Sequence, residues 1–157
     1  MAEAPDYGPS QRTPIYLSDP HPTPSNLQIL NDGQLGPSTL SFGVTFRSED
    51  AGEGVISVLY VDYKHGPVQT PAKHYHPAST FDNPRPVTYP VSTNAFAGRE
   101  GVCHSLTLML MHESGWDDQN NVPLGTPPDL ATMTWFTSVN DMGSLLQECP
   151  TTSNEMP

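Results

Sequence analysis

The sequence predicts an all-β protein, folded as an antiparallel sandwich of about seven short strands. Apolar side chains recur at every second position in residues 40–46 and 106–110, which is the repeat of a strand that buries one face. Gly, Pro and Asn-Asp turn signals separate these stretches, and no long amphipathic helix pattern is present. No internal repeat is visible, which argues against a propeller or a solenoid.

Residues 101–111 contain the strand that we expect at the centre of the sandwich. Three leucines alternate there with Ser, Thr and Met, a glycine stands at the start, and a polar stretch over 112–129 follows. We expect residues 112–129 to form a long loop without regular structure. Loops of this length in a compact domain are commonly functional.

The other strands are expected before and after this one. Residues 55–63 are apolar on both faces, so this strand should be covered on both sides. Residues 87–92 include Pro90, which argues for an edge strand or a bulge. Further short strands are expected at 13–18, 26–30, 69–75 and 131–139, and one helical turn at 144–148.

The chain length fits one domain with two flanking segments. We expect a Pro-rich extended arm over residues 1–24, the sandwich over 25–149 and a flexible tail over 150–157. The arm holds six of the eighteen prolines. Because proline fixes φ and has no N–H, the arm can lie along a sheet edge but not inside a sheet.

The chain is strongly acidic. Seventeen Asp and Glu against six Lys and Arg give a formal charge of -11. Nucleic acid and anionic membrane surfaces bind clusters of Lys and Arg and repel such a chain, so neither is expected as a partner. No apolar run is long enough for a membrane span. Residues 1–9 lack the basic and apolar regions of a secretory signal, so export would need a signal segment upstream of Met1.

The order of the expected strands carries a resemblance. Residues 42–47, 58–63 and 103–108, followed by the strand with Trp135, look like strands B, C, F and G of an immunoglobulin-like domain. Over roughly residues 38–140 the chain also resembles, in general pattern, the immunoglobulin-like domains of bacterial outer-surface lipoproteins. It departs from antibody domains because the B-like strand has no Cys and the C-like strand has no Trp. The resemblance implies an immunoglobulin-like fold and no particular activity.

Cys103 and Cys149 are the only two cysteines. In the sandwich, Cys103 begins the F-like strand, and the residues after the G-like strand can bring Cys149 back beside it. A disulfide closing this loop would stabilise the fold by about 4 kcal/mol, and would imply an oxidising, extracytoplasmic compartment. The alternative is a pair of buried reduced thiols.

Six histidines raise the question of a metal site. His74 and His76 share one face if their segment is a strand, and His65 lies just upstream. Three imidazoles can hold Zn or Cu, which would make the protein a small metal-dependent enzyme. The alternative is exposed histidines in a loop-rich segment, with no cofactor and no catalysis.

Two acidic loops form the candidate interaction site. In an immunoglobulin-like topology, residues 47–54 and 112–129 lie at the same end, and loops on a rigid sandwich commonly carry recognition. Their carboxylates could instead supply oxygens to calcium. The plainer alternative is that Arg47 pairs with Asp117 or Asp118 while the remaining acids are solvated. The candidate residues are Arg47, Glu49, Asp50, Glu53, Glu113, Trp116, Asp117 and Asp118.

Trp116, in the second loop, has two interpretations. Exposed beside a tyrosine it would stack on a glycan, whereas folded over the end of the core it would hold the loop in place. We expect a non-enzymatic, extracytoplasmic binding or structural module of a bacterial cell surface, whose partner is a protein or a surface glycan. A carbohydrate-binding module that uses Trp116 and tyrosines is one alternative, and a metal-dependent enzyme that uses His65, His74 and His76 is the other.

Overall fold

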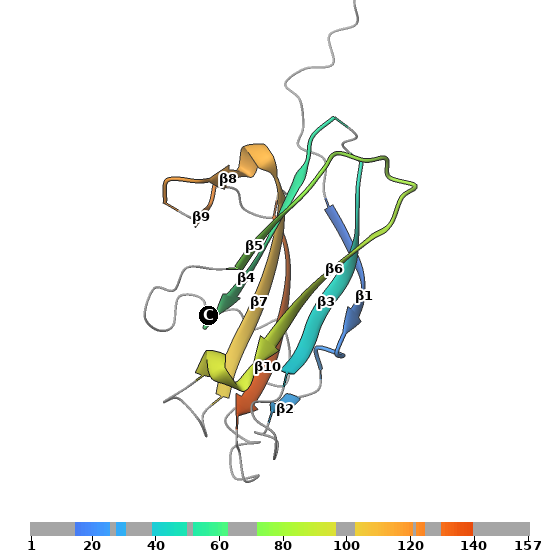
Figure 1. Ribbon diagram of the computed structural model, residues 1–157. Helices are drawn as coiled ribbons and strands as arrows, with labels where there is room; N and C mark the ends of the chain where they lie inside the picture. Colours follow the sequence, from blue (N-terminus) through green and yellow to red (C-terminus); the bar gives the residue numbers. More distant parts are fainter. Residues whose placement is uncertain are drawn as a thin grey trace, which may run out of the picture.

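The protein folds as two β-sheets packed face to face in an immunoglobulin-like sandwich (Figure 1), which confirms the predicted fold class. The computed structural model describes residues 15–25, 28–30, 39–49, 52–62, 72–96, 103–120, 122–124 and 130–139. Residues 1–14 of the predicted arm, the helical turn predicted at 144–148 and the predicted tail lie outside the described residues. No helix in the described part of the chain is long and apolar enough to cross a membrane.

The smaller sheet has three antiparallel strands in the order β1-β3-β6. They are β1 (Ile15–His21), β3 (Thr39–Ser48) and β6 (Arg85–Ser92). β1 confirms the edge strand predicted near residues 13–18, and β6 is the opposite edge, as Pro90 indicated. Pro86 and Pro90 lie four positions apart in β6 and therefore point their nitrogens to the same side, which an edge strand tolerates where that side faces away from the neighbouring strand.

The larger sheet has five strands in the order β2-β10-β7-β4-β5. They are β2 (Gln28–Leu30), β10 (Ala131–Val139), β7 (Cys103–His112), β4 (Val55–Val61) and β5 (Ala72–His76). β2 runs parallel to β10, and the other neighbours are antiparallel. β7 is therefore the middle strand, as predicted for residues 101–111, and the residues of β4 are buried on both of its faces, as its continuous apolar sequence predicted.

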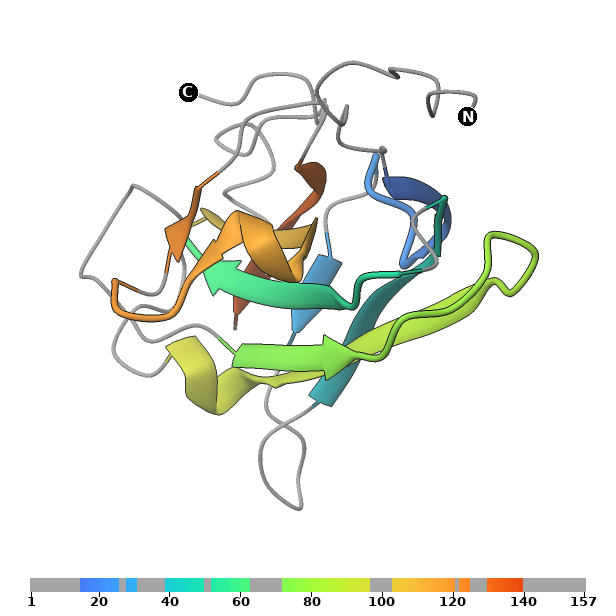
Figure 2. The same ribbon diagram turned by 90° about the horizontal axis from the view of Figure 1, so that it is seen from above.

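The chain passes between the sheets in the order that the resemblance implied. β3, β4, β7 and β10 occupy the places of strands B, C, F and G of an immunoglobulin-like domain. Residues 77–84 carry the chain from β5, an edge of the larger sheet, to β6, an edge of the smaller one. Seen from above, this connection projects beyond the sandwich (Figure 2).

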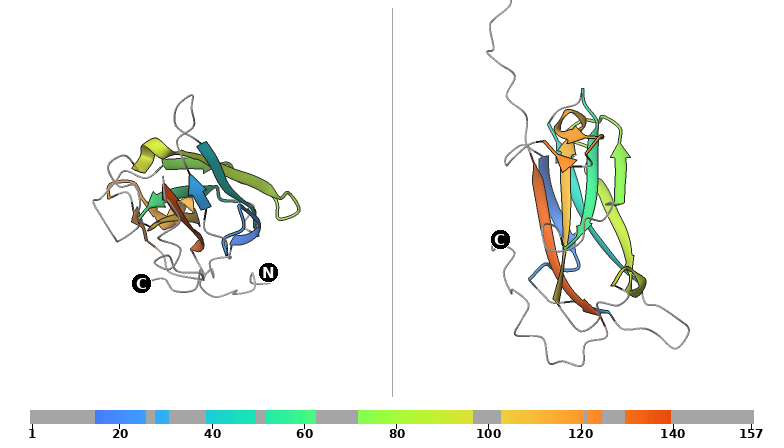
Figure 3. Two further views of the ribbon diagram at one scale, coloured as in Figure 1. Left: turned by 90° about the horizontal axis from the view of Figure 1, so that it is seen from below. Right: turned by 90° about the vertical axis from the view of Figure 1, so that its left-hand side faces the viewer.

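Residues 112–120 and 122–124, the described part of 112–129, are not the structureless loop that their composition predicted. A 3-10 turn, η2 (Glu113–Gly115), leads into a small hairpin of β8 (Trp116–Asp117) and β9 (Val122–Pro123), which lies beside the end of β7 (Figure 3). Sequence reasoning missed the hairpin because two-residue strands give no periodic signal. A second 3-10 turn, η1 (Thr93–Phe96), follows β6 at the opposite end of the sandwich.

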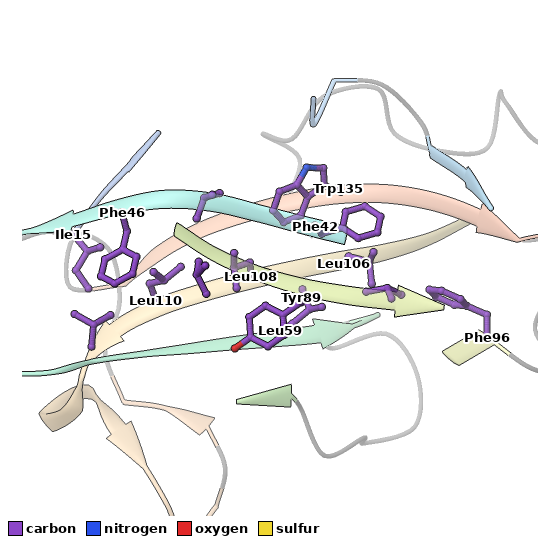
Figure 4. Close-up of a cluster of buried hydrophobic side chains, with 14 residues drawn as sticks. Ile15, Phe42, Phe46, Leu59, Tyr89, Phe96, Leu106, Leu108, Leu110 and Trp135 are labelled. Carbon is purple, nitrogen blue, oxygen red and sulfur yellow. The ribbon is translucent and has the colours of Figure 1, made fainter. Parts of the chain in front are cut away.

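Side chains from both sheets meet in one apolar core (Figure 4). The three leucines of β7 are fully buried in it, as their alternation predicted. Trp135 on β10 packs edge to face against Phe42 on β3, with ring centres 5.5 Å apart. The Trp135 indole donates a hydrogen bond of 2.6 Å to the Pro22 carbonyl, which satisfies its one polar group.

Hydrogen-bonded polar pairs also join the two sheets. Ser48 Oγ on β3 lies 2.6 Å from His112 Nε2 on β7, and both side chains are buried. The Tyr89 hydroxyl of β6 donates to the Ser57 carbonyl of β4 at 2.8 Å and lies 2.8 Å from Ser57 Oγ. The low local dielectric strengthens such bonds, so they fix the position of one sheet on the other.

Candidate functional site

The two predicted interaction loops meet at one end of the sandwich. The Glu113 amide donates to the Gly54 carbonyl at 3.0 Å, and the Ser114 amide donates to Glu53 Oε1 at 2.6 Å. The two residues of the buried Ser48–His112 pair stand in sequence where these two loops begin. We call this end the loop pole and define it as residues 47–49, 52–54, 77–85, 113–120 and 122–124.

A third segment, which no sequence pattern singled out, adds an exposed aromatic pair to the loop pole. Phe81, in the 77–84 connection, is 38% exposed and meets Tyr16 of β1 edge to face, with ring centres 5.7 Å apart. The Arg47 guanidinium lies 5.7 Å from the centre of the Phe81 ring. The Tyr16 hydroxyl donates to Glu49 Oε1 at 3.3 Å, and the Glu49 charge raises the pKa of Tyr16 above its usual range.

Every large hydrophobic side chain that the described residues leave exposed lies at the loop pole or beside it. These side chains are Tyr16, Tyr75, Phe81, Val122 and Leu124. Tyr75 of β5 is 57% exposed, and its ring covers Gly54, where a Cβ atom would stand 2.6 Å from the Tyr75 hydroxyl. Exposed aromatic side chains that gather at one end of a domain are typical of a surface that binds another molecule.

The acidic residues of the loop pole have local partners that differ from those predicted. Arg47 pairs with neither Asp117 nor Asp118, so that expectation is wrong. Asp118 Oδ1 instead accepts from Lys73 Nζ at 3.0 Å. Asp117 accepts from the Asn120 side chain at 2.7 Å and from the amides that follow it, and these hydrogen bonds lower the pKa of its carboxyl. Asp117 is thus bonded within its own segment, whereas Asp118 reaches across to β5.

Trp116 is buried and cannot serve as a glycan platform. Only 6% of its surface is exposed. It packs on the outer face of the larger sheet with the side chains of a second apolar cluster, namely Ile56, Val58, Tyr60, Met109, Met111 and Leu130. Lys73 Nζ lies 5.5 Å from its ring centre, and its Nε1 has no hydrogen-bond partner. The alternative in which Trp116 holds its loop against the domain is the correct one.

The predicted metal ligands do not converge among the described residues. No group of three or more His, Cys, Asp or Glu side chains in this part of the chain is placed to hold a metal ion. Glu53 is bonded to the Ser114 amide, and Asp117 and Asp118 are bonded to the partners given above. Asp50 and His65 lie outside the described residues.

His74 and His76 share one face of β5, as predicted, and this face turns towards the smaller sheet. His74 stacks on Tyr89 with ring centres 4.6 Å apart, and His76 Nε2 lies 2.9 Å from Ser57 Oγ. Burial lowers the pKa of His76, and the neighbouring charges of Arg85 and His74 lower it further. Burial also raises the pKa of Tyr89. These contacts join the two sheets at their edge.

Cys103 begins β7, as predicted, and no described cysteine is free. Cys149 lies outside the described residues, so the disulfide stays a prediction. The next residue, His104, is a buried histidine on this core strand. Its Nδ1 lies 2.7 Å from Asp62 Oδ2, and the Asp62 carboxylate also accepts from the Ser105 amide at 3.0 Å.

Comparisons with known proteins give only distant structural likenesses. No family model matches the chain, and no curated protein matches it. One similar solved structure is a chain of the complex between zinc 2-glycoprotein and prolactin inducible protein from human seminal plasma, with 12% identity, a TM-score of 0.45 and coverage of 82% of this chain and 96% of that chain. Another is the CARDB domain of a Pyrococcus furiosus protein in complex with di-metal ions, with 10% identity, a TM-score of 0.41 and coverage of 83% and 97%.

Proposed function

We propose that the protein is a non-enzymatic binding module that contacts a partner protein through the loop pole. The observation that carries this proposal is the gathering of all five exposed large hydrophobic side chains of the described residues at or beside that pole. Among them are three aromatic rings, the side-chain type that most often anchors a protein interface. A rigid β-turn at 80–83, closed by a backbone hydrogen bond of 3.1 Å, presents Phe81 at little cost in conformational entropy.

The charge of the loop pole indicates the chemistry of the partner. The pole and the adjoining strand β5 carry six carboxylates, on Glu49, Glu53, Asp82, Glu113, Asp117 and Asp118. Only three Lys or Arg side chains accompany them, on Arg47, Lys73 and Arg85. A partner with a basic surface around an apolar centre would complement this arrangement, and the charge would mainly raise the rate of association.

We further propose that the protein works outside the cytoplasm, on a bacterial cell surface. The pattern resemblance to surface lipoprotein domains and the two cysteines support this location. Thiol titration of the denatured protein without reductant tests this location. If neither cysteine has a free thiol, the result would agree with an oxidising compartment. Two titratable thiols in protein isolated from its natural cells would contradict it.

Site-specific crosslinking tests the binding surface. A photoreactive phenylalanine analogue is placed at Phe81 or at Tyr75, and a matched control places it at Asn94, which is exposed in η1 at the opposite end. In the cells that naturally make the protein, we expect one discrete adduct from both pole positions and none from Asn94. Substituting both aromatic residues with Ser should weaken binding to the protein in that adduct by about tenfold or more.

Two outcomes would reject the loop pole as the binding surface. One is equal crosslinking from Asn94, which would mean unselective contact. The other is the absence of adducts from both pole positions while other exposed sites give them. Because Phe81 and Tyr75 lie at the surface, the Ser variants should keep their folding midpoint, and circular dichroism checks this.

A further inference from the structure

A group of basic side chains lies at the seam between the two sheets, where β5 and β6 form neighbouring edges. His74 and His76 come from β5, and Arg85 begins β6 after the 77–84 connection. His74 is exposed, whereas His76 and Arg85 are half-buried. The group therefore lies between solvent on one side and aromatic side chains of the core on the other.

Side-chain contacts hold the three bases close together. The Arg85 guanidinium lies 4.5 Å from the centre of the Phe46 ring, and the His76 ring centre lies 5.1 Å from the same ring centre. His74 stacks on Tyr89, whose hydroxyl is bonded through Ser57 Oγ to His76. The charges of Arg85 and His74 both act on His76, which confirms their proximity.

No carboxylate neutralises this group among the described residues, although the chain carries a net charge of -11. Arg85 forms no ion pair with a described residue, and burial lowers its pKa. Its Nη1 donates to the Pro77 carbonyl, while its Nε is buried and has no hydrogen-bond partner. Lys73, the neighbouring base on the opposite face of β5, is by contrast paired with Asp118.

We propose that this seam is a binding site for a multivalent oxyanion, in which Arg85 and the imidazoles of His74 and His76 hold a phosphate, a sulfate or a polycarboxylate. A guanidinium binds such groups through charge-assisted hydrogen bonds, and its planar fork fits both tetrahedral and carboxylate oxygens. An anion there would offset the repulsion between Arg85 and an imidazole that takes up a proton beside it. The site shares Arg85 with the loop pole, but anion binding there does not require the proposed partner.

Anion binding at this site must be linked to protonation. His76 is held in its neutral form by burial and by the neighbouring bases, and a bound anion favours the charged imidazole. Affinity should therefore rise on acidification, by up to about tenfold per pH unit where one proton is taken up on binding. Tyr89 is the other titratable group that faces His76, and it stays protonated at these pH values because burial raises its pKa.

Nuclear magnetic resonance of the full chain tests the site. Sulfate is titrated at constant ionic strength, with chloride as the exchanged ion, since sulfate keeps its charge over the relevant pH range. We expect saturable shifts of the amides of His74, His76 and Arg85, with affinity that increases from about pH 8 to about pH 6. Parallel titrations with phosphate, citrate and acetate show which oxyanion geometry is preferred.

Matched substitutions decide whether Arg85 is the main ligand. Arg85→Met keeps the stem that packs on Phe46 and removes the charge, and it should weaken sulfate binding about tenfold to a hundredfold. Arg47→Met is the control and should leave it unchanged. If Arg85→Met fails to fold, the exposed His74→Gln replaces it and should weaken binding measurably. His76→Gln should reduce the pH dependence of the affinity, and the double substitution His74→Gln with His76→Gln should remove it.

Two results would overturn the proposal. The first is amide shifts that do not saturate, or that chloride reproduces at the same ionic strength. Such shifts would show only the screening of charges by salt and no specific anion site. Equal affinity in the wild type, Arg85→Met and His74→Gln would place any bound anion elsewhere. Neither result would bear on the partner-binding pole, because crosslinking from Phe81 and Tyr75 is read independently.

Discussion

Removing the Tyr89 hydroxyl should weaken the joint between the two sheets. Tyr89 is only 2% exposed, and its hydroxyl makes two hydrogen bonds of 2.8 Å to Ser57, one to the carbonyl oxygen and one to Oγ. Tyr89→Phe keeps the ring and leaves those buried oxygens without this partner. At about 0.5–1.5 kcal/mol for each hydrogen bond, we expect a loss of about 1–3 kcal/mol in the free energy of unfolding.

Urea denaturation followed by circular dichroism measures this loss of free energy. In thermal denaturation, the melting temperature should fall by about 2–12 °C. Tyr75→Phe is the matched control, because it removes the same atom from a side chain that is 57% exposed and should change stability by less than about 0.5 kcal/mol. Hydrogen exchange of the β5 amides should quicken only in Tyr89→Phe. Equal stability of the two variants would refute the claim that this hydroxyl joins the sheets.

Three further predictions concern pH, packing and surface charge. The pKa of His76 is lowered from 6.5 in the folded protein, so the unfolded chain binds a proton there more readily. The free energy of unfolding should therefore fall as the pH drops below about 6.5. Urea titrations at several pH values measure this dependence, and His76→Gln should flatten it below about pH 6.5. Gly43→Ala should cost about 1–3 kcal/mol by thermal denaturation, because its Cβ would overlap the Val87 carbonyl oxygen; an unchanged midpoint would contradict this. Asp118→Asn should cost less than about 1 kcal/mol, since its ion pair with Lys73 is exposed, and the difference from wild type should shrink in high salt.

The strand pattern was predictable because side-chain alternation is a local property of the sequence. The leucines of β7 and the continuous apolar run of β4 gave the positions of both strands in the larger sheet. The expected immunoglobulin-like topology predicted that the two acidic loops would lie at the same end of the sandwich. What these observations share is that neither depends on the conformation of any single side chain.

The contacts of the loop pole were less predictable, because long side chains can reach several neighbours. Arg47 was expected to pair with an acid, yet it lies over Phe81, which is one aromatic residue in a polar segment and has no periodic signal. Trp116 could equally well have faced solvent. The apolar outer face formed by Val58 and Met109 was the only indication that a large side chain would be needed to cover it.

The basic seam was visible in the sequence only in part. His74 and His76 drew attention as a metal site, and their shared face was correctly expected. Arg85 was not considered, because eight residues separate it from His76 and only the crossing between sheets brings them together. Such a pairing depends on the path of a connection, which local patterns do not specify.

The prolines of β6 affect how this protein behaves at high concentration. A free sheet edge can template the addition of strands from other molecules, which leads to aggregation and fibrils. Pro86 and Pro90 remove two of the N–H groups along the open side of β6, so an incoming chain finds an interrupted ladder there. The β6 edge of the smaller sheet is therefore a poor template for strand addition when many copies crowd together.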